Sequence, residues 1–182
     1  MNKLVKKILV GVMAATMALG SVTTAFAATS PATATKPVTK EDVKATNGST
    51  VNTSKKGTAS LEAVKKTSAK SVTVSSKVKV GKVTYTVTTI KANAFKNAPK
   101  ATKITLPSTI TFLGAKSFSG AKSLKTIAVT SKKAIKVSKS AFKGLNTKKI
   151  TVKVKGMSKK ELTAFKKNLS KAGFKGTVKV VK

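Results

Sequence analysis

The sequence predicts a β-rich α/β repeat solenoid, with a β-hairpin cap at its N-terminal end and a helix-plus-strand cap at its C-terminal end. The first observation is a recurring phrase, in which Phe95, Phe118 and Phe142 are separated by 23 and 24 residues. The second is an apolar pair at i and i+2, nine residues after each of the first two phenylalanines. This spacing places both side chains on one face of a strand. One such unit cannot cover its own apolar side, whereas about three stacked units form a continuous core.

Each repeat unit offers the same set of core positions. An apolar residue lies five places before each phenylalanine: Ile90, Leu113 and Val137. A small residue, which permits a tight turn, lies directly before each phenylalanine: Ala94, Ser117 and Ala141. The isoleucines expected to lie in the strands are Ile104, Ile127 and Ile150, so the third unit is expected to be one residue shorter. We assign the three phenylalanines to the core rather than to a ligand-binding aromatic stripe.

The segments on either side of the repeats have the patterns of terminal caps. Residues 77–87 read as two strands of period-two apolar residues joined at Gly81-Lys82. After the repeats, Ser158 to Glu161 form a capping box, and the apolar residues that follow fall on one helical face, which Gly173 ends. The final run, TVKVV, predicts a last strand.

The N-terminal part of the chain has the composition of export and linker segments. Early lysines, an apolar run and an A-x-A site ending at Ala27 predict a secretory signal peptide over 1–27. Residues 28–58, rich in Ala, Thr, Ser and Lys, are expected to form a flexible tether, and 60–66 at most a weak helical turn, with order from near Ser71. The remaining domains are an N-terminal cap with the β-hairpin over 59–89, about three repeats over 90–156, and the C-terminal helix and strand cap over 157–182.

The repeats also share a longer motif. The stretches IKANAF, ATKITLPSTITFLGAKSF and LKTIAV carry it over 90–154, with a Pro at Pro107 and a Gly at Gly114. Together they resemble the BspA-type leucine-rich repeat family of secreted and surface proteins of bacteria, whose unit runs as Ile-x-x-x-Ala-Phe, Leu-x-x-Ile-x-Ile-Pro and Val-x-x-Ile-Gly. The Cys that often follows the family's phenylalanine is replaced by Ala98, Ala121 and Leu145. The resemblance implies a short right-handed leucine-rich repeat coil, with its ligand face on the outward residues of the stacked strands.

The composition excludes most catalytic chemistry. The chain has no His and no Cys, so the usual general base, thiol nucleophile and most zinc sites are absent. Its four carboxylates, at Glu41, Asp42, Glu62 and Glu161, are dispersed along the chain. Ser-x-x-Lys pairs occur no more often than chance predicts in a chain with this much lysine. We therefore expect a non-enzymatic protein with no catalytic residues, no metal site and no cofactor.

The charge predicts an anionic partner. All 38 basic residues are Lys, and the formal net charge is +34, a field that attracts polyanions. The candidate ligand-binding ladder is the outward face of the repeat strands, with Ala128 between its members: Lys103, Thr105, Thr126, Lys149, Thr151 and Lys153. The expected partner is an anionic cell-wall or host-surface polymer or an extracellular protein. The expected location is secreted, extracellular or loosely cell-wall associated, with no transmembrane segment after signal cleavage.

Several alternatives remain open at the level of sequence. The ladder residues could merely solvate an exposed sheet, and the lysine content could be a compositional habit of the secreted proteins of the source organism. A cationic membrane-active or nucleic-acid-binding protein is a second reading, although the ladder has no aromatic residue to stack on bases and no specific nucleic acid is expected. A repeat-family remnant with no ligand of its own is a third. The sequence leaves the oligomeric state undecided.

Overall fold

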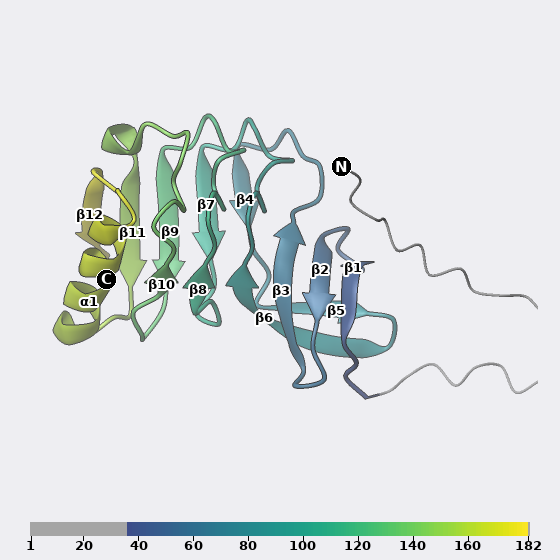
Figure 1. Ribbon diagram of the computed structural model, residues 1–182. Coiled ribbons are helices and arrows are strands. Elements are labelled where there is room, and N and C mark those ends of the chain that lie inside the picture. The colour runs from purple at the N-terminus through teal and green to yellow at the C-terminus, as the bar shows by residue number, and fades with distance from the viewer. Residues whose placement is uncertain (1–35, 182) are drawn as a thin grey trace, which may run out of the picture. The chain divides into compact units, whose positions relative to one another are not determined.

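The structure is a computed structural model that describes residues 36–181, which form two β-sheets, an α-helix and a short 3-10 helix (Figure 1). The five-stranded sheet has the order β12-β11-β9-β7-β4: β4 Ser71–Thr73, β7 Lys103–Leu106, β9 Thr126–Thr130, β11 Thr151–Lys155 and β12 Thr177–Val180. The seven-stranded sheet has the order β1-β2-β3-β6-β8-β10, with β5 paired to β6: β1 Lys40–Lys44, β2 Thr50–Thr53, β3 Thr58–Ala63, β5 Lys77–Val80, β6 Val83–Ile90, β8 Phe112–Leu113 and β10 Lys136–Val137. The helices are η1 Thr147–Lys149 and α1 Lys159–Lys171.

The strands of the five-stranded sheet are all parallel, as a solenoid requires when each coil contributes one strand. Their register aligns one inward residue from each strand: Val72, Ile104, Ile127, Val152 and Val178. On the other side of the coil, a second parallel register aligns Leu61, Ile90, Leu113 and Val137. These rows confirm the predicted repeat solenoid and the core positions five places before each phenylalanine.

The phenylalanines stack directly on one another inside the coil. The ring centroids of Phe95 and Phe118 are 5.2 Å apart and those of Phe118 and Phe142 are 5.3 Å apart, with interplanar angles of 10° and 3°. Phe174, which follows the helix, extends the column at 5.1 Å with a tilt of 52°. All four rings are buried, so the assignment of the three repeat phenylalanines to the core is confirmed.

The predicted spacing of the third unit was wrong. Val152, not Ile150, pairs with Ile127. The first inward residue of β11 therefore lies ten residues after Phe142 rather than eight. The intervening residues form η1, and Ile150 is its C-cap, with its N–H donating to the carbonyl of Thr147 at 3.0 Å. Ile150 is buried all the same, which explains why apolarity alone placed it in the strand.

The predicted flexible tether over 28–58 was wrong for the part that the structure describes. Strands β1 and β2 and the start of β3 lie within it, and β3 replaces the expected helical turn over 60–66. Their inward residues alternate with period two: Val51, Thr53, Ala59, Leu61 and Ala63. The buried Thr53 bonds through its hydroxyl, which accepts from the Lys40 N–H at 3.0 Å and donates to the Val38 carbonyl at 2.8 Å. Because small and hydroxyl-bearing residues fill three of these five inward positions, the strands have a composition that resembles that of a linker.

The stack also begins one coil earlier than the predicted start at residue 90. Leu61 on β3 pairs with Ile90, and Val72 on β4 pairs with Ile104, as in the later coils. The segment between β3 and β4 bonds to the first phenylalanine turn, with the Val64 N–H donating to the Ala94 carbonyl at 2.9 Å. The coil formed by β3 and β4 has no phenylalanine, so the recurring phenylalanine motif could not predict it.

The predicted hairpin is present. Strands β5 and β6 pair antiparallel from Val80 opposite Val83, and Gly81 in the turn has a φ of +59°, a conformation that glycine adopts without strain. On the long strand β6, the hydroxyl of Tyr85 accepts from the Val38 N–H at 2.9 Å. The hairpin is therefore tied to Val38, just before β1, and the Val38 carbonyl also accepts from Thr53 of β2.

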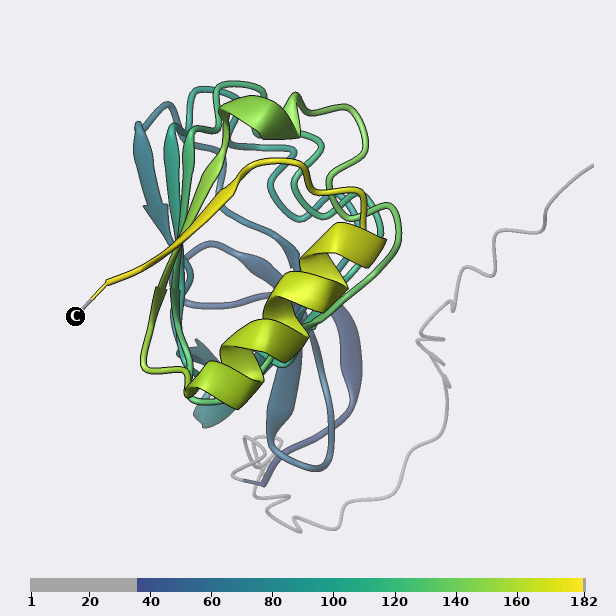
Figure 2. The same ribbon diagram turned by 90° about the vertical axis from the view of Figure 1, so that its left-hand side faces the viewer.

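The predicted C-terminal helix and strand are present as α1 and β12. The Ser158 hydroxyl caps the helix by accepting from the Glu161 N–H at 3.3 Å, and Gly173 after its end has a φ of +77°. Figure 2 shows the helix lying across the C-terminal end of the stack. It is held there by the Asn168 side-chain amide, which donates to the Ile135 carbonyl at 2.9 Å.

The expected signal peptide, 1–27, and residues 28–35 of the expected tether lie outside the described residues. Among residues 36–181, no helix has the length and hydrophobicity needed to cross a membrane.

Candidate functional site

The candidate site is the outward face of the five-stranded sheet, which we call the outer ladder. Because neighbouring strands are parallel and in register, outward residues of successive coils form rows across the strands, about 4.8 Å apart from one strand to the next. The first row is Ser71, Lys103, Thr126, Thr151 and Thr177. The second row is Thr73, Thr105, Ala128, Lys153 and Lys179. A short third row pairs Thr130 with Lys155.

The structure brings together most of the residues that the sequence proposed for this face. Five of the six candidates lie on the outer ladder: Lys103, Thr105, Thr126, Thr151 and Lys153. Lys149 does not, because it belongs to η1, before strand β11 begins. The sequence reading missed the contributions of β4 and β12, since both strands lie outside the three repeats from which the ladder was deduced. A period-two pattern in each strand was the available signal.

Lysine is the only ionisable residue type on the outer ladder. Its four lysines are exposed: Lys103, Lys153, Lys155 and Lys179. The carboxylates of the chain lie elsewhere in the sequence, and two of them are engaged. Glu62 pairs with Lys91, with Nζ 3.3 Å from Oε1, and the Glu161 carboxylate accepts from the Ala134 N–H at 2.6 Å. The ladder lysines therefore present uncompensated positive charge to solvent.

The threonines give the ladder a second chemical character. Thr105, Thr126 and Thr151 are half-buried between neighbouring side chains, whereas the lysines extend beyond them into solvent. Hydroxyls both donate and accept hydrogen bonds, and ammonium groups only donate. This face can therefore bind an extended anion through charge and hydrogen bonds, and it has no aromatic ring for stacking on a neutral sugar or a base.

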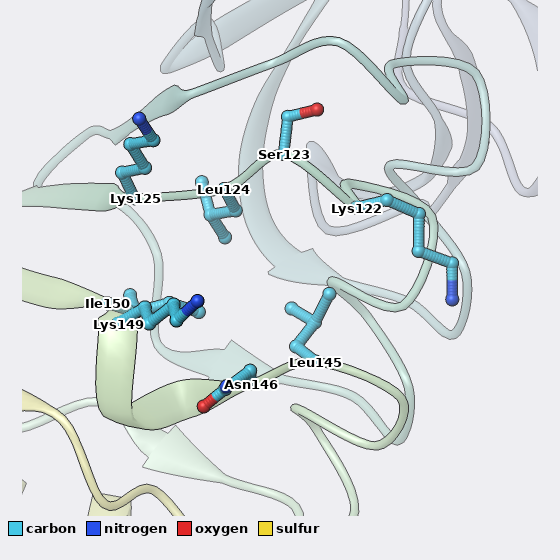
Figure 3. A pocket seen from close by; sticks show the side chains of 8 residues that line it. All are labelled: Lys122, Ser123, Leu124, Lys125, Leu145, Asn146, Lys149 and Ile150. Atoms are coloured by element: carbon cyan, nitrogen blue, oxygen red, sulfur yellow. The ribbon is translucent and has the colours of Figure 1, made fainter.

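Lys149 lies instead on the rim of a hollow of about 220 Å³ between two successive coils (Figure 3). Leu124 and Ile150 are buried at the hollow, with Leu145 half-buried beside them. Lys122 and Lys125 also line it. The sequence placed Lys149 beside Thr151 because they are two residues apart, but the 3-10 turn moves it to the edge of the coil.

These features define a parallel β-solenoid of the leucine-rich repeat class, with a lysine- and threonine-bearing sheet face. Residues 88–182, more than half of the chain, match the family model described as BspA type leucine-rich repeat region (6 copies). The chain belongs to the BspA-type leucine-rich repeat family. This match confirms the resemblance carried by the repeat motifs and extends it through the C-terminal helix and strand.

Two solved structures of bacterial repeat proteins are similar to this chain. One is a leucine-rich repeat protein from Bacteroides capillosus, at 14% identity and a TM-score of 0.48, covering 78% of this chain and 100% of that chain. The other is a leucine rich cell surface protein from Faecalibacterium prausnitzii, at 17% identity and a TM-score of 0.49, covering 80% of this chain and 42% of that chain. No curated protein matches the sequence.

Proposed function

We propose that this chain is a secreted, non-enzymatic binding protein, held on anionic cell-wall or host-surface polymers through the outer ladder. The observation that carries the proposal is the register of the five-stranded sheet, which gathers four exposed lysines and several threonines on one face without a carboxylate. Membership of a family of bacterial surface and secreted proteins, whose repeats serve binding in general, supports the same reading.

The spacing of the exposed lysines favours a polymer over a small anion as the ligand. Exposed lysines stand at separate points of the ladder, so a small anion would meet few of them, whereas a chain of repeated charges lies across several strands. Because each exposed contact is weak in water and screened by salt, retention depends on many contacts made together. Lysine suits this role, since its ammonium is a flexible point charge rather than a fixed bidentate fork.

The test is co-sedimentation of the purified protein with bacterial cell walls, intact or stripped of their anionic polymers. A ladder variant replaces Lys103, Lys153 and Lys155 with Gln. The matched control replaces three exposed lysines on turns of the N-terminal strands with Gln, and so removes the same charge: Lys55, Lys56 and Lys82. Circular dichroism and urea unfolding of both variants establish that each is folded.

We expect the intact walls to retain the original protein and the control, and to release the ladder variant at lower salt. Stripped walls should retain none of the three. Equal loss from the two variants would show that diffuse charge, rather than this face, holds the protein. Retention that survives both stripping and high salt would overturn the electrostatic proposal itself.

A further inference from the structure

Among residues 36–181, the five-stranded sheet ends at strand β12, and no described strand pairs with the outer edge of β12. The Thr177 N–H donates to the carbonyl of Ile150, directly before β11, at 3.1 Å, and the Val181 N–H donates to the carbonyl of Val154 on β11 at 2.9 Å. Alternate residues of a parallel strand direct their main-chain groups to opposite sides, so the N–H groups of Val178 and Val180 point to the open edge. An exposed strand edge of this kind is a template for a further strand.

The apolar row of the core is also uncovered at this edge. Val180 continues the inward row of Leu106, Val129 and Val154, yet 61% of its surface is exposed, compared with 1% for Val154. Val178 on the same side is only half-buried, and the following Val181 is 37% exposed. A strand added to the edge would cover these valines with its own inward side chains.

The outward side of the same edge is positive. Lys179 lies beside Lys153 in the second row of the outer ladder, and Lys175 is exposed just before the strand. From Ser131 to the end of the described chain, the sequence has one carboxylate, Glu161, which bonds to the Ala134 N–H. The edge therefore combines main-chain groups that pair with no other strand of residues 36–181, an exposed apolar row and the neighbouring ammonium groups of Lys175 and Lys179.

We propose that β12 binds an extended acidic segment of another protein, which adds to the five-stranded sheet as a further strand. Its apolar side chains lie beside Val178 and Val180, and its alternate carboxylates lie beside Lys179, the β12 member of the second row of the outer ladder. Main-chain hydrogen bonds supply binding and the alternate side chains supply specificity, as in other modes of strand addition. A second copy of this strand is a poor occupant, because pairing would bring the lysines of both copies together. This site is separate from polymer retention and does not depend on it.

The test uses two variants of one residue. Val180→Pro removes the N–H at the open edge while leaving the bonds to β11 in place, and Val180→Thr keeps that N–H with a side chain of similar shape. The probe is a fluorescently labelled octapeptide of alternating Glu and Val, measured by anisotropy. Hydrogen exchange at the Val178 and Val180 amides reports where it binds.

We expect the peptide to bind the original protein and Val180→Thr, to slow exchange at both edge amides, and to bind Val180→Pro about tenfold more weakly. A charge reversal supplies a second, independent result. Lys179→Glu should weaken binding of the Glu-Val peptide and strengthen binding of a Lys-Val peptide of the same length. Since Lys179 is exposed, this variant should fold normally.

Three results would overturn the proposal. Equal binding of the Glu-Val peptide to Val180→Pro and Val180→Thr would show that charge alone attracts it. Unchanged exchange at the Val178 and Val180 amides would place it elsewhere. Dimerisation of the peptide-free protein in analytical ultracentrifugation, lost in Val180→Pro and kept in Val180→Thr, would identify a second copy as the occupant of the edge.

Discussion

Replacement of Phe118 with Ala tests the packing of the stack most directly. The ring is buried between Phe95 and Phe142, with centroid distances of 5.2 and 5.3 Å. Truncation of a buried phenylalanine costs about 3 to 5 kcal/mol, and each aromatic pair contributes about 0.5 to 1.5 kcal/mol beyond its buried area. Because Phe118→Ala loses two such pairs, we expect it to lower the unfolding free energy by about 5 kcal/mol, the upper end of the range for a buried phenylalanine.

Two further variants separate the stacking from the burial. Phe118→Leu keeps most of the volume and loses both pairs, for an expected cost of about 1 to 3 kcal/mol. Phe174→Ala, at the end of the column, loses one tilted pair and should cost about 1 kcal/mol less than Phe118→Ala. Urea unfolding followed by circular dichroism measures all three. A cost below about 2 kcal/mol for Phe118→Ala, or a larger cost at Phe174, would refute the stacked column.

Four other perturbations have definite expected outcomes in the same unfolding assay. Ser117→Ala should raise the unfolding free energy by about 1 kcal/mol, because its buried hydroxyl has no hydrogen-bond partner among residues 36–181 and the coils before and after it carry alanine there, at Ala94 and Ala141. Gly120→Ala should lower it by about 1 to 3 kcal/mol, since a Cβ would lie 2.2 Å from the Lys96 Cα. Ser158→Ala should cost about 1 kcal/mol through loss of the helix cap, and Ser158→Asp should restore most of it. Raising salt from about 0.01 to 0.15 M should raise the melting temperature, because it screens repulsion among the lysines of a chain with net charge +34.

The sequence predicted those parts of the fold in which one residue type recurs at a fixed place. Phenylalanine is rare in this chain, so its three repeats marked the coils and located the strands that follow the first two. Phe174 was not predicted to join the column because it follows a helix and lies outside the repeat motif, although its ring packs at the end of the same column. A side chain joins the phenylalanine column because of its position in the folded structure, so a segment outside the repeats can contribute one.

The N-terminal strands could not be predicted by composition because three of their five inward residues, Thr53, Ala59 and Ala63, are small or hydroxyl-bearing. Alanine and threonine, as at Ala59 and Thr53, are nearly as common in linkers as in strands. Only the alternation of buried and half-buried residues distinguishes these strands from a linker. Thr53 is acceptable in the core because its hydroxyl is fully engaged with the Val38 and Lys40 main chain. Such a hydrogen bond depends on tertiary structure, so the local sequence carries no sign of it.

The candidate site was more predictable than the fold around it, because outward positions follow from strand register alone. Once Ile104 and Ile127 were placed inward, Lys103, Thr105 and Thr126 had to face outward. The error at Lys149 arose where a 3-10 turn broke the period of two.

The inward and outward positions of the stack are under different physical constraints. Inward residues must match their neighbours in volume, since each coil packs on the next along continuous apolar rows. Outward residues contact solvent, so their identity affects stability mainly through charge repulsion. The residues of the outer ladder are therefore less constrained by packing than the inward rows, whereas β12 carries an exposed apolar row beside Lys179. A partner that adds a strand there would satisfy the main-chain groups, cover the exposed valines and neutralise the adjacent lysines in one contact.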